Sequence, residues 1–144
     1  MQLDAVGNEL RRVQLPRHMD PHHAVESPTG TFIVSHRNTE LKQHQVSEVD
    51  SGGEVLRQFG GSRRPSLGRP PHVAVDSHDK IFVADFDNRR ILLLDAELKL
   101  RRVIDEHQLS HRRPRRLCYV ERTGQLLVGF ERDGNVAVFD VLRR

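Results

Sequence analysis

The stretch PHVAVDSHDKIFVADFDNRRILLLD, from Pro71 to Asp95, decides the fold of this chain. Short runs of branched apolar residues alternate in it with groups of Asp, Asn, Ser and His residues that favour turns. The connections are too short for the crossovers that parallel strands need. We therefore predict four antiparallel strands joined by hairpins, at Val73–Val75, Ile81–Ala84, Ile91–Leu94 and Leu98–Ile104.

A period of about 45 residues extends this pattern along the chain. An apolar residue followed by aspartate recurs at Asp4, Asp50, Asp95 and Asp140, at intervals of 46, 45 and 45 residues. The string LRRV occurs both at 10–13 and at 100–103. Such a period is typical of repeat architectures, in which each unit buries its apolar faces against its neighbours.

The two flanking copies predict further strands of the same kind. Runs such as Ile91–Leu94 lack polar alternation, so both faces of each sheet should be covered, as in the radial stack of sheets called a β-propeller. The additional strands are expected near Leu10–Leu15, Ala24–Val25, Thr31–Val34, Gln45–Val49, Val55–Phe59, Leu117–Val120, Gln125–Val128 and Val136–Val141.

We therefore predict an all-β fold in a single domain, residues 1–144, that forms a partial β-propeller of about three four-stranded antiparallel blades. Residues 1–15 would supply the last strand of a preceding blade. The blades would span 21–59, 71–104 and 114–144, the last of them without its fourth strand. Rings normally need at least four blades. The remaining blades would come from a longer chain, of which this is a fragment because Met1 falls within a repeat, or from a homodimer partner.

The segment Pro71–Asp95 resembles an NHL repeat in its V-A-D string, its N-x-R type of turn and its closing apolar-Asp pair. The other two copies match loosely: His36 and Phe130 stand at the position of Asp85, and the loop Ser35–His44 is longer. The resemblance implies a six-bladed NHL-like propeller. It also implies relatives among the tripartite-motif proteins, which recruit RNA or protein targets, and among extracellular and enzymatic propellers.

The composition limits the classes of protein to which the chain can belong. Hydrophobic residues make up 36% of the chain and charged residues 30%. There is no apolar run of about 18 residues and no signal-peptide pattern, which predicts a cytoplasmic protein without a membrane partner. The single cysteine, Cys118, cannot form an internal disulfide and is expected to be a buried, inert thiol in a strand.

Arginine supplies 20 of the 23 basic residues, and the net charge is +3. Strand polarity brings the connections between second and third strands, and those between blades, to one face of the propeller. That face is predicted to be basic, and loops on a rigid scaffold commonly carry binding. The candidate binding residues are Arg37, Arg63, Arg64, Arg69, Arg89, Arg90, Arg112, Arg113, Arg115 and Arg116.

These arginines favour a non-enzymatic binding module for an acidic protein or peptide. One alternative is single-stranded RNA, with arginines neutralising phosphates and stacking on bases, although aromatic platforms are scarce. The other is a gluconolactonase-like, metal-dependent hydrolase fragment, for which no ligand set is assembled. No cofactor and no catalytic residue are predicted, and His18, His22, His23 and His72 match no metal-ligand spacing.

Several polar residues are predicted to stabilise turns. The repeated aspartates should accept backbone N–H groups where the third strand of each repeat ends. Asp85 should bind Asn88 and one of the two arginines that follow it, across the turn between the second and third strands.

Overall fold

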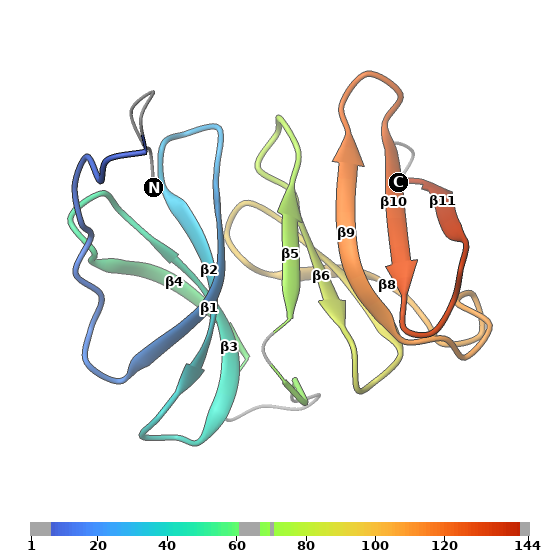
Figure 1. The fold of residues 1–144 in the computed structure, drawn as a ribbon, viewed down its shortest axis with the longest axis horizontal. Coiled ribbons are helices and arrows are strands. Elements are labelled where there is room, and N and C mark those ends of the chain that lie inside the picture. Colours follow the sequence, from blue (N-terminus) through green and yellow to red (C-terminus); the bar gives the residue numbers. More distant parts are fainter. Residues whose placement is uncertain (1–6, 61–66, 70, 142–144) are drawn as a thin grey trace.

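A computed structural model of the chain describes residues 7–60, 67–69 and 71–141. Eleven strands and no helix occur in these ranges. The strands form three antiparallel sheets that lie side by side (Figure 1). The all-β class, the antiparallel pairing and the three-stranded last sheet are thereby confirmed. The described part of the chain contains no helix long and apolar enough to cross a membrane.

Within each sheet the strands follow one another in chain order. The first sheet contains β1 (Met19–Glu26), β2 (Phe32–Asn38), β3 (Gln43–Val49) and β4 (Val55–Gly60). The second contains β5 (His72–Val75), β6 (Ile81–Asp85), β7 (Arg90–Leu94) and β8 (Leu100–Ile104). The third contains β9 (Pro114–Val120), β10 (Gln125–Phe130) and β11 (Val136–Asp140).

Two apolar cores hold the three sheets face to face. Ile33 and Val46 of the first sheet pack with Val83 and Leu92 on one face of the second. Phe82, Ile91 and Leu93, on the opposite face of the second sheet, pack with Leu126 and Val128 of the third. The first strands of the sheets, β1, β5 and β9, contact one another in this order. The middle sheet is thus covered on both faces, as the apolar runs of the sequence predict.

Aspartates fix the hairpin turns. Asp50 Oδ1 accepts the N–H groups of Gly52 and Glu54, both at 2.9 Å, and Asp95 Oδ1 accepts those of Glu97 and Lys99 at 2.9 and 3.0 Å. Asp76 makes the same two bonds in the turn before β6. The predicted turn role is confirmed for Asp50 and Asp95, whereas Asp4 lies outside the described residues.

The predicted loop Ser35–His44 is wrong, because β2 and β3 extend through most of it. His36 is buried, and its Nε2 lies 2.7 Å from Ser47 Oγ, while Asn38 Nδ2 donates to Gln45 Oε1 at 3.2 Å. Polar side chains that form hydrogen bonds between β2 and β3 replace the apolar residues of the other sheets here. The pairing of β2 with β3 therefore continues to Asn38 and Gln43, beyond the point at which hydrophobicity alone predicts that these strands end.

The predicted strand at Leu10–Leu15 is also wrong: residues 10–16 lie outside every strand. The segment runs instead over the outer face of the first sheet, where Leu15 packs with Val34 and Val49. It passes so close to the β3–β4 turn that a Cβ on Gly53 would collide with the Gln14 carbonyl oxygen. A segment becomes a strand when its backbone pairs with the edge of a sheet. Residues 10–15 lie over the face of the first sheet instead, where no described strand presents an edge to them.

Cys118 differs from expectation as well, because it is exposed. In β9 it alternates with Leu117, which is buried in the core between the second and third sheets. The outer face of the third sheet has no further sheet packed against it within the described residues, so Cys118 points away from the core and lies at the surface.

We expect Asp50→Ala to lower the free energy of unfolding by about 1–2 kcal/mol, because two backbone N–H groups lose their acceptor. Asp50→Asn keeps an oxygen at the Oδ1 position and should retain most of that stability. Urea unfolding of the two variants beside the unchanged chain measures the difference. Equal losses in both variants would contradict the turn role.

Candidate functional site

The arginine-bearing connections gather at one end of the sheets, the lower end in Figure 1. They are the β2–β3, β6–β7 and β10–β11 turns and the connections that precede β5 and β9. Of the ten predicted binding residues, Arg63 and Arg64 lie outside the described residues. The other eight lie in or next to these connections: Arg37, Arg69, Arg89, Arg90, Arg112, Arg113, Arg115 and Arg116.

Three of them surround one aromatic ring. The guanidinium carbons of Arg69, Arg115 and Arg113 lie 4.5, 5.4 and 5.5 Å from the centre of the Phe86 ring. Phe86 follows β6 and is itself only 8% exposed. A guanidinium within about 6 Å of a ring face is attracted by the ring quadrupole. The Phe86 ring therefore brings three guanidinium groups together, one from the connection before β5 and two from the start of the third sheet.

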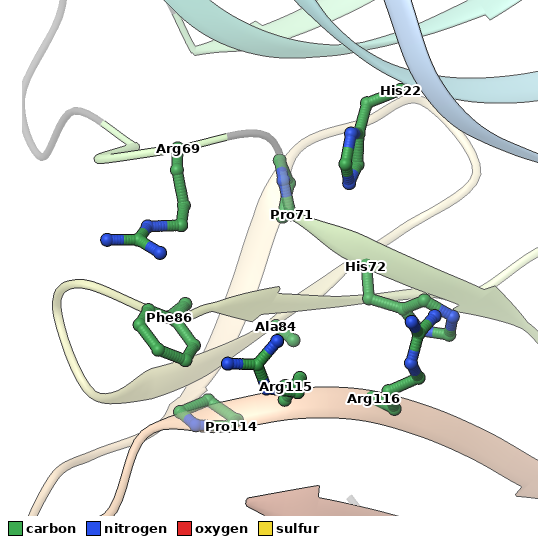
Figure 2. A pocket seen from close by; sticks show the side chains of 9 residues that line it. All are labelled: His22, Arg69, Pro71, His72, Ala84, Phe86, Pro114, Arg115 and Arg116. Carbon is green, nitrogen blue, oxygen red and sulfur yellow. The ribbon is translucent and has the colours of Figure 1, made fainter. Parts of the chain in front are cut away.

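A pocket of about 210 Å³ opens beside this cluster (Figure 2). Arg69 and Phe86 lie at one side of it, Arg116 and His72 at the other, and Arg115 between them. His22 approaches from β1, so the lining comes from all three sheets. The described lining residues include no carboxylate and are His22, Arg69, Pro71, His72, Ala84, Phe86, Pro114, Arg115 and Arg116.

A β-bulge brings two consecutive arginines to the same pocket. Gly129 pairs with Arg116 and Phe130 with Pro114, which leaves Arg115 as the extra residue of β9. Successive residues of a regular strand point to opposite faces, and a bulge re-aims one of them. The first sheet has the same irregularity: Pro21 pairs with His36 and His23 with Ser35, which leaves His22 extra. Both bulged residues, Arg115 and His22, line the pocket.

Two carboxylates flank the pocket and partly neutralise it. Asp87 lies 3.1 Å from Arg69 and 3.7 Å from Arg113, and Glu131 lies 3.9 Å from Arg113 and 3.6 Å from Arg115. They position the guanidinium groups around Phe86. Arg116 forms no ion pair with any described residue and is exposed. Its charge is therefore available to an anionic ligand.

Neutral histidines complete the inner side of the site. The rings of His23 and His72, from the adjacent strands β1 and β5, stack with their centres 4.1 Å apart. His72 Nδ1 accepts the backbone N–H of Leu117 at 3.1 Å, which links the second sheet to the third. Burial, then the neighbouring His23 and Arg116, lower the pKa of His72 to about 4. Burial likewise lowers the pKa of His23.

Other predicted binding residues have partners inside the fold. Arg90 donates from Nε to Asp85 Oδ2 at 2.6 Å, and Asn88 Nδ2 donates to both carboxylate oxygens, so the predicted turn pairing of Asp85 is confirmed with Arg90 as its arginine. Burial raises the pKa of Asp85, and these donors act against that rise. Arg112 covers Phe130 at 4.0 Å and binds Asp133 at 2.9 Å.

Sequence reasoning found the arginines but missed the features that assemble them. Phe86 was not among the predicted binding residues, and His22 and His72 were considered only as metal ligands, for which their spacing is unsuitable. Both bulges leave a trace in the sequence, since two polar residues follow Pro21 and Pro114 before the next apolar residue, whereas one follows Pro71.

Comparisons with known proteins extend only to the fold. No family model matches the chain, and no curated protein matches it. A crystal structure of a protein of unknown function from Bacteroides caccae superposes with a TM-score of 0.63 at 16% sequence identity. The match covers 96% of this chain and 48% of that one, so the chain spans about half the length of the structure it resembles.

We expect the chain to lose stability as the pH falls from about 6.5 toward 4. Protonated His72 cannot accept the Leu117 N–H, and a folded-state pKa below the ordinary value of 6.5 means that protons bind the unfolded chain more tightly. The loss is measured as the change in the urea midpoint between pH 7.5 and 4.5. It should be smaller in His72→Leu than in the unchanged chain. In the control His78→Leu, which alters an exposed turn residue, it should equal that of the unchanged chain. Equal pH dependence in all three proteins would contradict this role.

Proposed function

We propose that the chain is half of a six-bladed, NHL-like propeller and that it acts as a non-enzymatic binding module for acidic peptides. Three features support the architecture. In each sheet the strands pair in chain order, the first strands β1, β5 and β9 are adjacent, and the resembling structure is about twice as long. Within the second sheet, the NHL-like segment Pro71–Asp95 forms β5, β6 and β7.

The observation that carries the binding function is the pocket beside Phe86. It presents Arg69, Arg115 and Arg116 without a carboxylate among its described lining residues, and it combines these charges with apolar walls from Pro71 and Pro114. Glutamate or aspartate side chains can accept bidentate hydrogen bonds from guanidinium groups there. The prolines and Phe86 provide apolar surface for the flanking methylene groups of the peptide.

The same geometry makes single-stranded RNA the weaker candidate. Base stacking needs an open aromatic face, and the two rings near the arginines, Phe86 and Phe130, are 8% and 6% exposed and already covered by guanidinium groups. The arginines are therefore arranged for carboxylates at fixed positions rather than for a row of stacked bases.

We expect a fluorescein-labelled octaglutamate peptide to bind, and Arg116→Ala to weaken its affinity by about tenfold, because an exposed charge-assisted contact is lost. Arg115→Ala should have a similar effect. Arg122→Ala is the matched control, since Arg122 lies in the β9–β10 turn at the opposite end of the sheets. Fluorescence anisotropy at low and moderate salt measures the affinities.

Three outcomes would count against this function. Equal affinity in Arg116→Ala and Arg122→Ala would show that the peptide does not use the pocket. Tighter binding of a twelve-residue oligouridine than of octaglutamate, with a steep salt dependence, would favour RNA instead. Absence of peptide binding at any salt concentration would overturn the proposal.

A further inference from the structure

We infer that the pocket beside Phe86 selects one particular anion, the doubly charged phosphate of a phosphoserine in a peptide, over the carboxylates of glutamate and aspartate. The inference rests on the proposed function, because it names the group that the same pocket binds most tightly. It follows from the charge balance at the pocket, from the hydrogen-bond donors that the fold leaves unused, and from the way in which Arg69 is positioned.

The pocket and the ion pairs at its rim have an excess of two positive charges. The nearby His23 and His72 add no charge at pH 7, because burial lowers the pKa of both. A phosphate monoester carries about −1.5 to −2 charges at this pH, whereas a carboxylate or a phosphodiester carries a single negative charge. One phosphate monoester therefore balances an excess that one carboxylate would only halve. The charged groups are Arg69, Arg113, Arg115 and Arg116 on the positive side, and Asp87 and Glu131 on the negative side.

Two of these arginines keep their side-chain donors free of hydrogen bonds to the fold. The side chains of Arg115 and Arg116 donate no hydrogen bond to any other described residue. Arg115 lies 3.6 Å from Glu131, which is longer than a hydrogen bond. Each guanidinium group has five N–H donors in a planar fork. Because Arg115 is the bulged residue of β9, both forks reach the same pocket, and an anion there can bind them without breaking a hydrogen bond of the fold.

The three guanidinium groups of the lining approach from different sides. In Figure 2, Arg69 lies on the side of Phe86, Arg116 on the side of His72, and Arg115 between them. A carboxylate presents two oxygens in one plane, whereas a phosphate monoester presents three strong acceptor oxygens arranged as a tripod. Each oxygen of the tripod can bind one guanidinium group. A carboxylate would leave one of the three groups without an oxygen of its own.

A short side chain such as phosphoserine suits the position of these donors. The side chains of Arg69 and Arg115 are 56% and 54% exposed, so the phosphate does not have to reach deep into the molecule. A phosphotyrosine would bring an aromatic ring that needs an open face to stack on. The Phe86 ring offers none, because it is buried and covered by guanidinium groups.

The segment 67–69 positions Arg69 before any ligand binds. Leu67 is buried in the core between the first and second sheets, and its backbone pairs with His44. A Cβ on Gly68 would collide with the side chain of Asp87, which binds Arg69 at 3.1 Å. The segment therefore lies this close to Asp87 only because residue 68 has no side chain. A donor that is already in position loses less entropy when the ligand binds.

The test compares two peptides of equal charge at pH 7.5 and physiological ionic strength. The first is a fluorescein-labelled pentapeptide of glycines with one central phosphoserine. The second carries two glutamates in place of the phosphoserine and one glycine. By fluorescence anisotropy, we expect the phosphoserine peptide to bind about tenfold more tightly, because both of its charges lie on one group. A third peptide, with unmodified serine, should bind more weakly than either.

Glu131→Gln tests the charge balance through a gain of affinity, which a damaged fold could not produce. Glu131 is farther than hydrogen-bond distance from Arg113 and Arg115, so the substitution removes an opposing charge and leaves a side chain of the same shape. We expect phosphoserine binding to become about threefold tighter. Asp133→Asn is the matched control, because Asp133 binds Arg112, which does not line the pocket. Unchanged or weaker binding in Glu131→Gln would contradict the inference.

Gly68→Ala tests the position of Arg69 without changing any charge. The added methyl group displaces the segment from Asp87, and we expect the phosphoserine affinity to fall about fivefold. Gly134→Ala is the control, because a Cβ at this glycine of the β10–β11 turn meets nothing within 4 Å. The same affinity in both variants would show that Arg69 takes no part in phosphate binding.

Each remaining outcome overturns the inference. If the two charged peptides bind equally, the pocket does not distinguish phosphate from carboxylate, and only this inference fails. If neither they nor octaglutamate binds, the proposed function fails as well. Inorganic phosphate that binds as tightly as the phosphoserine peptide would assign the pocket to free phosphate. Tighter binding of a twelve-residue oligouridine than of the phosphoserine peptide would assign it to RNA.

Discussion

The fold depends on the need to cover both faces of the middle sheet. β6 is buried along its whole length, and β7 is buried from Ile91 to Leu94. Both faces of each strand are therefore apolar and would be unfavourable if they were exposed to water. A sheet of this kind is stable only between two others. The first and third sheets supply that cover, and their packing brings β1, β5 and β9 together. The connections that carry the arginines then fall at one end of the molecule.

This constraint explains which parts of the fold the sequence predicted. The second sheet was predicted strand by strand, because its apolar runs and aspartate turns record burial and hairpins directly. The polar extension around His36 and Ser47 was missed, since its stability comes from side-chain hydrogen bonds between strands, which hydrophobicity does not record. The bulges at His22 and Arg115 were missed because one additional polar residue after Pro21 and after Pro114 does not by itself indicate a change of hydrogen-bond register.

The site illustrates the same limit. Ten arginines were predicted to share a face, but their residue type did not reveal which would be engaged within the fold. Arg90 stabilises a buried carboxylate and Arg112 binds Asp133, whereas Arg116 has no acidic partner among the described residues. What separates them is the distance to the nearest carboxylate, which depends on how neighbouring sheets are placed. The sequence therefore predicted that these arginines share one end of the sheets, which the structure shows for the eight described ones, but it could not rank them.

The pocket is also the part of the molecule most sensitive to how the sheets are held. Its lining joins His22 of the first sheet, Arg69 and Phe86 of the second, and Arg115 and Arg116 of the third. Within the described chain the third sheet is packed on one face only, so its arginines are positioned against Phe86 by a single core and by the ion pairs of Asp87 and Glu131. Cover on the outer face would restrict this sheet further. Because ordering a binding site in advance reduces the entropy lost when ligand binds, contacts around β11 would strengthen binding at a pocket they do not touch.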